Sequence, residues 1–199
     1  MLSDDFPHIV WDARFGQWWR IHNAEHGAWW FSSSDEPERD ESQIGRFDLP
    51  VPFGTCYLAA YLAGGAAESL RESGVREIAA QHAANKRHLS QMPLDRWYGT
   101  RIADFASPAC DSYGAPPDIV GLSRAEARPW AIAAHDAGFA GIYYRLREDP
   151  AHRVGLALFH EAGEHRPTGA PGGVALPVGL RRELTDLFEG DFRGDPLPK

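Results

Sequence analysis

Three side chains that together suit a nucleotide lie within residues 45–68, GRFDLPVPFGTCYLAAYLAGGAAE. Arg46 carries a guanidinium, which can bind a phosphate or diphosphate. Tyr57 offers an aromatic face for a planar ring, and Glu68 offers a carboxylate that can stabilise developing positive charge. Taken alone, the same residues are more typical of an ordinary strand–helix unit with an exposed Arg, a half-buried Tyr and a Glu on a helix face. Both interpretations stay open at this point.

A second guanidinium precedes this stretch. Residues 17–22, QWWRIH, are rich in Trp and Ile and are predicted to form a strand. Because side chains alternate along a strand, Arg20 lies on the opposite face from Trp19 and Ile21. An arginine in that place is usually solvated. If its face forms the wall of a cleft, however, it is a rigid anchor for an anion.

The elements that position these groups follow from hydrophobic spacing and turn residues. Residues 45–68 are predicted to contain a short strand carrying Arg46, a proline-rich turn, and a second strand carrying Tyr57. A helix is predicted over residues 62–73 with Glu68 near its start, and a further helical pattern covers residues 75–89.

The rest of the chain adds strands at residues 101–105, 141–145 and 154–159, and a loop at residues 108–117. The clearest helix covers residues 122–136, where Ser123 and Glu126 form an S-x-x-E capping box and Pro129 separates off the first turns. An amphipathic helix closes the chain at residues 178–188. Strands do not alternate regularly with helices, so the fold class is α+β.

The length of 199 residues favours a single domain over residues 1–199, with a core at about residues 17–160 and a helical extension at about residues 174–192. Five of the seven Trp residues fall in the first thirty positions, which indicates an ordered N-terminal region. The net charge of −8 disfavours direct binding of nucleic acid. Eighteen of the twenty basic residues are Arg, enough to line a local anion site.

The sequence lacks the patterns of a signal peptide, a membrane span and a metal site. The N-terminus lacks a signal-peptide pattern, and no apolar run is long enough to span a membrane, so a soluble, cytoplasmic protein is expected. Cys56 and Cys110 are too few for a disulfide framework or a thiolate metal site. His160 and His165 are five residues apart, whereas the HExxH zinc motif needs four, so no metal site is predicted.

An ordered set of short motifs resembles the RES-domain family. The set runs from W-R-I at Trp19 through G-R-F-D at Gly45, Y-L-A at Tyr57 and A-x-E ending at Glu68. It continues through I-A-D-F-A-S, Pro129-Trp130-Ala131 and G-F-A-G-I-Y-Y, and it spans Trp18 to Phe159. The resemblance implies a split antiparallel or mixed sheet similar to that of ADP-ribosyltransferase toxins. It also implies a toxin of a bacterial toxin–antitoxin pair that degrades NAD+.

Carried over by position, the resemblance implies a catalytic set of Arg20, Tyr57 and Glu68. It implies NAD+ binding by Arg20, Arg46, Tyr57 and Tyr144, with NAD+ as the substrate and no separate cofactor. Cleavage of the nicotinamide–ribose bond passes through an oxocarbenium-like state. The leaving ring departs neutral, so the site needs a carboxylate, cations on the diphosphate and an aromatic surface, but no general acid.

One position departs from the family pattern. Where members carry Ser after G-I-x-Y-x, this chain carries Leu146, whose side chain neither donates nor accepts a hydrogen bond. Ser69 and Ser107 are the hydroxyls that could substitute for it. The leading hypothesis is therefore an NAD+ glycohydrolase, phosphorylase or ADP-ribosyltransferase, and the rival is a catalytically inert scaffold that binds a protein or nucleotide. A nucleic-acid-modifying enzyme is a third option, which the net charge disfavours.

The resemblance also implies a partner, a helix-turn-helix (Xre-type) antitoxin. The acidic loop at residues 33–43 and the C-terminal helix are the candidate surfaces for it, although such a loop is also typical of a solvated surface. A homo-oligomer is left open, and no membrane partner is expected.

Overall fold

The computed structural model describes residues 2–35, 44–71, 87–116, 118–147, 153–166 and 172–176. Within these ranges eight strands form one mixed sheet in the spatial order β1-β6-β7-β8-β4-β2-β5-β10. Its strands are β1 (His8–Val10), β2 (Trp18–Asn23), β4 (Phe53–Ala59), β5 (Arg87–Met92), β6 (Arg101–Asp104), β7 (Gly141–Arg145), β8 (Val154–Glu161) and β10 (Val174–Ala175). Neighbouring strands are antiparallel except β6 and β7, which are parallel.

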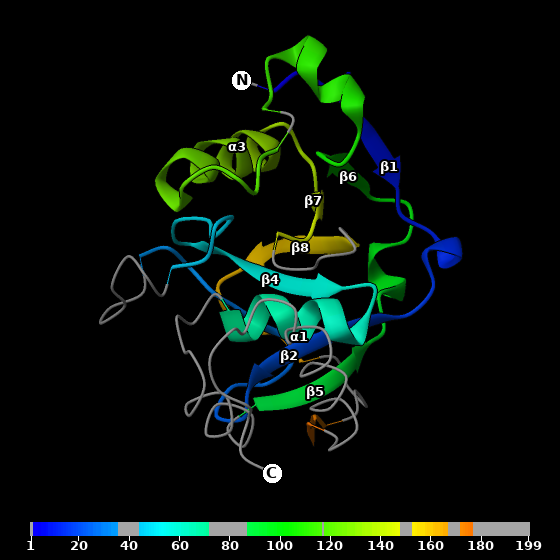
Figure 1. Cartoon of the computed structure of the whole chain (residues 1–199), viewed down its shortest axis with the longest axis vertical. Helices are drawn as coiled ribbons and strands as arrows, with labels where there is room; N and C mark the ends of the chain where they lie inside the picture. The colour runs from blue at the N-terminus through cyan, green and yellow to red at the C-terminus, as the bar shows by residue number, and fades with distance from the viewer. Residues whose placement is uncertain are drawn as a thin grey trace, which may run out of the picture.

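Two helices accompany the sheet. The first, α1 (Leu62–Arg71), packs against β2 and β4, and the second, α3 (Arg124–Asp136), packs against β7 (Figure 1). The short strands β3 (Trp30–Phe31) and β9 (Gly163–Glu164) pair in a second sheet. Three 3-10 helices complete the described elements: η1 (Ala13–Phe15), η2 (Asp95–Trp97) and η3 (Pro108–Tyr113). None of the described helices is long and apolar enough to cross a lipid bilayer.

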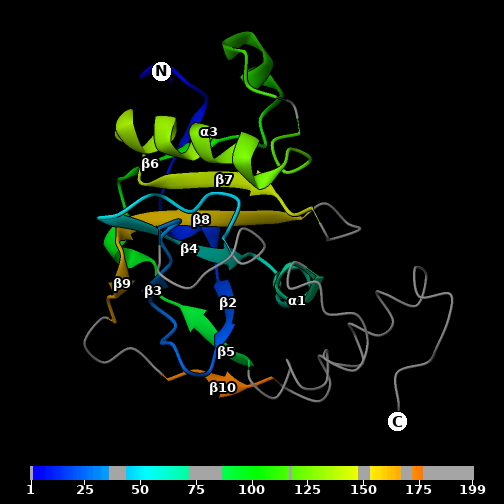
Figure 2. The ribbon, with the colours of Figure 1, turned by 90° about the vertical axis from the view of Figure 1, so that its left-hand side faces the viewer.

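The large sheet opens in its middle, between β2 and β4. These two strands pair only where Trp19 faces Ala59. At the other end of β4, Thr55 instead forms a bridge with Ser32, and its N–H and C=O both bond to that residue. The edge of β4 is thus shared by two segments, which leaves a gap between them. Figure 2 shows β2 and β5 descending away from the β4–β8 pair.

Apolar side chains cover the sheet in two buried clusters. One cluster joins α3, through Ala127, Ala131 and Ala134, to Phe47, Phe139 and Leu146. The other contains three of the five N-terminal tryptophans, Trp11, Trp18 and Trp29, which are at most 2% exposed. Burial of these large rings explains why the N-terminal region is ordered, as their number in the sequence predicts.

Much of the predicted fold is confirmed. The α+β class and the mixed sheet are as expected, and so are the strands predicted at residues 17–22, 101–105, 141–145 and 154–159. Ser123 Oγ accepts a bond from the Glu126 N–H at 3.3 Å, and Glu126 Oε2 accepts one from the Ser123 N–H at 3.0 Å, which completes the predicted capping box. The prediction that Pro129 separates off the first turns was wrong, because helix α3 runs unbroken through Pro129.

Several expectations were wrong in detail. Arg46 lies in a turn rather than a strand, because the Asp48 side chain and the Gly45 backbone close a tight loop there. Arg87–Met92 forms strand β5 instead of the end of a helix, because it pairs with the whole length of β2. The loop at residues 108–117 contains η3, and Glu68 lies in the second turn of α1. The predicted helix at 178–188, residues 75–86 of the predicted helical pattern and residues 36–43 of the acidic loop lie outside the described residues.

Gly141 offers a test of the β7–β8 packing. A Cβ on this residue would overlap the backbone oxygen of Ala157 and crowd the Leu158 backbone, neither of which can move aside cheaply. We expect Gly141→Ala to lower the free energy of unfolding by about 1–3 kcal/mol, as overpacking does. Denaturant titration measures this. Gly172→Ala is the matched control, because a Cβ there meets nothing within 4 Å; equal stability of both variants would contradict the packing.

Candidate active site

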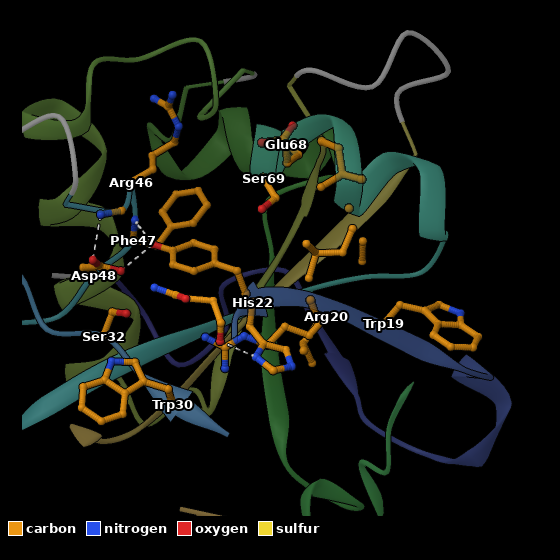
Figure 3. A pocket seen from close by; sticks show the side chains of 18 of the residues that line it. Trp19, Arg20, His22, Trp30, Ser32, Arg46, Phe47, Asp48, Glu68 and Ser69 are labelled. Carbon is orange, nitrogen blue, oxygen red and sulfur yellow. Dashed lines mark hydrogen bonds between the residues drawn. The ribbon is translucent and has the colours of Figure 1, made fainter. Parts of the chain in front are cut away.

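The opening between β2 and β4 holds a cavity of about 660 Å³. This volume lies in the range of small-molecule sites. All five residues predicted to form the site, Arg20, Arg46, Tyr57, Glu68 and Tyr144, lie on its wall. In the view of Figure 3, Arg46, Glu68 and Ser69 lie above, Arg20 and His22 below, and Trp30 at the lower left. The structure therefore brings together residues that are far apart in the sequence.

Arg20 is buried in the wall of the opening, with 9% of its surface exposed. Its Nη1 donates to the Ala28 carbonyl oxygen at 2.6 Å and lies 2.8 Å from Cys56 Sγ. No carboxylate pairs with Arg20 among the residues that the structure describes. A buried cation without a counter-ion is costly unless an anion joins it. The face of β2 that carries Arg20 is thus a cavity wall, the second of the two options that the sequence left open.

Arg87, at the start of β5, is a second cation on the same wall. Its pKa is lowered from the ordinary value, first by burial and then by the neighbouring charge of Arg20. Within the described ranges Arg87 also has no ion-pair partner. Two like charges held near one cavity favour a ligand with more than one negative charge.

The G-R-F-D motif is a turn built around the buried carboxylate of Asp48. Asp48 Oδ2 accepts a bond from the Gly45 N–H at 2.7 Å, and Oδ1 accepts one from the Tyr57 hydroxyl at 2.9 Å. The same hydroxyl accepts a bond from the Phe47 N–H at 2.8 Å. A Cβ on Gly45 would collide with both Tyr57 Oη and Asp48. The motif thus fixes the orientation of the Tyr57 ring and of the turn that carries Arg46.

Arg46 is held at both ends, its backbone by the Gly45–Asp48 turn and its guanidinium by a hydrogen bond. Its Nη1 donates to the Leu122 carbonyl oxygen, just before α3, and only 7% of its surface is exposed. Its place is therefore set by the turn at one end of the side chain and by the α3 approach at the other. Arg124, at the start of α3 and two residues after Leu122, also lines the cavity. With Arg20 and Arg87, four arginines line this cavity together with the two carboxylates Asp48 and Glu68.

Helix α1 supplies the carboxylate and a hydroxyl. Glu68 and Ser69 are both half-buried, and both line the cavity. Figure 3 shows the Ser69 hydroxyl directed toward the centre of the site. Ser107, the other candidate hydroxyl, is elsewhere: it caps η3 by accepting from the Ala109 N–H and is not part of the cavity wall.

Tyr144 and Leu146 form the apolar side of the wall. Tyr144 is 5% exposed and meets the Phe47 ring edge-on at 5.0 Å between centroids. Leu146 is 1% exposed and packs over Gly155, where an added Cβ would lie 2.7 Å from Leu146 Cδ2. Leu146 thus fills the position at which the family pattern has Ser, and the serines that line the cavity are Ser32 and Ser69.

His22 holds the turn that follows β2. Its Nδ1 lies 2.9 Å from the carbonyl oxygens of both Asn23 and His26, so this nitrogen carries the proton and donates. Its Nε2 then accepts from the Ser90 hydroxyl at 3.0 Å. The pKa of His22 is lowered from the ordinary value, chiefly by burial. The neutral ring thereby joins β2, β5 and the turn that provides the oxygen bound by Arg20.

Several wall residues escaped the sequence prediction, among them His22, Trp30, Asp48 and Arg87. Asp48 stands in the quoted G-R-F-D motif, so the motif itself was a signal for it. Arg87 had no such signal, because its place depends on the β2–β5 register, in which it faces Asn23. The His160 and His165 rings lie 4.3 Å apart, but no group of three or more His, Cys, Asp or Glu among the described residues could hold a metal ion.

The lowered pKa of His22 predicts a pH dependence of stability. The unfolded chain binds this proton with a pKa of about 6.5, and the folded chain binds it less tightly, so the stability that neutral His22 provides is present above about pH 6.5 and is lost as the pH falls below it. We expect the melting temperature to drop between about pH 7.5 and pH 5.5. The drop should be smaller in His22→Asn. Burial also lowers the pKa of His160, so His160 accounts for a separate part of the drop in melting temperature. A drop of the same size in His22→Asn and in wild type would contradict the role of His22.

Comparisons with known proteins identify the fold and the family. A search of curated proteins finds no match. Among solved structures, a chain in the crystal structure of the M. tuberculosis MbcT-MbcA toxin-antitoxin complex is similar, with a TM-score of 0.54 and 20% sequence identity. The match covers 89% of this chain and 91% of that chain, and at this identity it shows a shared fold. Residues 17–174 match the RES domain. The chain is a member of the RES-domain family.

Proposed function

We propose that this protein cleaves NAD+ at the nicotinamide–ribose bond, as the toxin of a toxin–antitoxin pair. The observation that carries the proposal is the placement of two guanidinium groups, Arg20 and Arg87, together with a helix carboxylate, Glu68, around one cavity. Neither guanidinium has an ion-pair partner among the residues that the structure describes. Cations suit the diphosphate of a dinucleotide, and a carboxylate suits the positive charge that develops on its ribose. Membership of the RES-domain family and the fold shared with a toxin–antitoxin structure support the same reading.

Each residue has a defined task in the proposed reaction. The bond between ribose C1′ and the pyridinium nitrogen breaks, and its electron pair goes to that nitrogen, so nicotinamide leaves neutral. Glu68 stabilises the resulting oxocarbenium ion, which an acceptor then attacks at C1′. If the acceptor is water, the products are ADP-ribose, nicotinamide and one proton. Tyr57, with its hydroxyl fixed by Asp48 and Phe47, presents its ring to the nicotinamide.

The carboxylate is the first target for a test. We expect Glu68→Gln to lower the rate of nicotinamide release by about 10²–10³, the effect of removing one positioned electrostatic group. Binding of ADP-ribose, measured by calorimetry, should change little, because the charge of Glu68 acts mainly on the transition state. Glu161→Gln, at an exposed carboxylate outside the cavity, is the matched control. Equal rates for wild type and Glu68→Gln would remove Glu68 from the mechanism.

The cationic wall predicts a different pattern. Arg87→Ala should weaken binding of ADP-ribose by about tenfold, since a charged hydrogen bond to phosphate contributes about 1.5–3 kcal/mol. The loss should shrink at high salt, where charges are screened. Calorimetry at two salt concentrations measures both effects. Arg14→Ala is the control, because Arg14 is 86% exposed and pairs with Asp12; a similar loss in that variant would deny Arg87 a specific role.

A second candidate function is a scaffold that binds NAD+ without turnover. The buried Leu146 favours it, since the hydroxyl that family members carry at this position is replaced by an apolar side chain. One calorimetric and kinetic experiment separates the two functions. Nicotinamide release with water, phosphate or a protein acceptor supports the enzyme, and saturable NAD+ binding with no release under all three conditions supports the scaffold.

The partner in the proposed pair is an antitoxin with a helix-turn-helix domain. The net charge of −8 suits a partner whose DNA-binding surface is basic. A reading frame for a small helix-turn-helix protein beside this one would support the pairing. Co-expression supplies the functional readout, because such an antitoxin should relieve growth inhibition and the drop in cellular NAD+ together.

A further inference from the structure

We infer that the stacked pair His26–Trp30 is the platform for the adenine ring of the dinucleotide. This inference rests on the proposed function. It identifies the end of the cavity that binds the adenosine end of NAD+, which lies away from the bond that is cleaved. Both residues line the cavity, and their rings lie 4.5 Å apart at 22°. Trp30 is only half-buried, so it keeps aromatic surface beyond what His26 covers. Stacking on an aromatic side chain is a general way to hold a nucleobase.

The turn that carries the pair is held rigid by several short contacts. The His26 N–H donates to the Asn23 carbonyl oxygen at 3.1 Å, and the Trp30 N–H donates to that of Gly27 at 3.2 Å. His22 Nδ1 bonds to the His26 carbonyl oxygen, as described above. The Gly27 N–H donates to Glu164 Oε2 at 2.9 Å, and a Cβ on Gly27 would overlap that carboxylate. The platform is therefore formed before any ligand arrives, which lowers the entropy cost of binding.

Trp29, just before β3, and Trp30, its first residue, have different roles because their side chains point in different directions. Trp29 is 2% exposed and stacks on Trp97 at 5.3 Å in the buried core. Trp30 follows it and faces the cavity instead. A large indole at a cavity wall covers the area of a purine, and the buried neighbour fixes its backbone. The structural contribution of this Trp-Trp sequence therefore comes from Trp29, which leaves Trp30 available to a ligand.

The position of the platform matches the order of groups along a dinucleotide. In Figure 3, Glu68 lies at the top of the site, Arg20 lies below it, and Trp30 lies lower still and to the left. Arg20 is bonded to the Ala28 carbonyl oxygen, within the same turn as His26 and Trp30. This order corresponds to nicotinamide riboside at Glu68, diphosphate at Arg20 and adenosine at Trp30. The nicotinamide end is assigned to Glu68 because the developing charge must lie there.

The test compares two substrates that share the scissile bond. Nicotinamide mononucleotide has the same nicotinamide–ribose bond as NAD+ but lacks the AMP half. We expect Trp30→Leu, which keeps apolar bulk but removes the ring, to raise KM for NAD+ by about tenfold, the loss of one stacked base. Its cleavage of nicotinamide mononucleotide should stay at the wild-type rate. Trp30→Phe should recover most of the NAD+ affinity, and Tyr98→Ala, which removes an exposed ring outside the cavity, should change nothing.

Binding of AMP, followed by calorimetry, supplies a readout that does not require turnover. Wild type should bind AMP, and Trp30→Leu and His26→Ala should each bind it about tenfold more weakly. AMP binding that depends on Trp30 supports the platform even if NAD+ is never cleaved, in which case only the proposed function fails. The inference is overturned if wild type cleaves NAD+ but does not bind AMP. It is also overturned if Trp30→Leu slows both substrates equally while its melting temperature matches wild type.

Discussion

The structure depends on a competition for one edge of β4. Two segments share that edge: β2 pairs with it at Ala59, and Ser32, the residue after β3, pairs with it at Thr55. A continuous sheet would have filled this space with ladder hydrogen bonds. Here the edge is divided, and the cavity occupies the division. The site is thus a consequence of how the backbone pairs, and side chains from both halves of the sheet reach it.

Charge placement follows from that geometry. Arg20 enters the opening from β2 and finds only a carbonyl oxygen and a thiol, so its charge is buried without a counter-ion in the described part of the chain. The protein has a net charge of −8, so the electrostatic potential in this cationic cavity is opposite in sign to that of the protein as a whole. Such an inversion concentrates anions at the site and repels them elsewhere. Aromatic rings at the wall add selectivity for anions that carry flat groups.

The sequence predicted best the features that depend on near neighbours. The capping box at Ser123 and the alternation in β2 involve residues a few positions apart, and both appear as expected. Arg46 was placed in the wrong element because Asp48 closes its turn onto Gly45 and is itself held by the Tyr57 hydroxyl, a tertiary contact that local propensity does not record. Arg87 and Trp30 were not predicted as site residues, because strand register and a tight turn, rather than any motif, bring them to the cavity. Motifs identified Glu68, the carboxylate proposed for catalysis, whereas the residues around it depend on tertiary pairing.

The single pairing of Trp19 with Ala59 has a mechanical consequence. Among the described strands, backbone hydrogen bonds join the two halves of the sheet at this place alone. Side-chain packing makes the rest of the connection, because α1 packs against both β2 and β4, and one buried cluster contains Trp18 of β2 together with Leu58 of β4 and Leu156 of β8. A ligand in the cavity would touch both halves, so its binding would add contacts across the gap and stabilise the folded sheet.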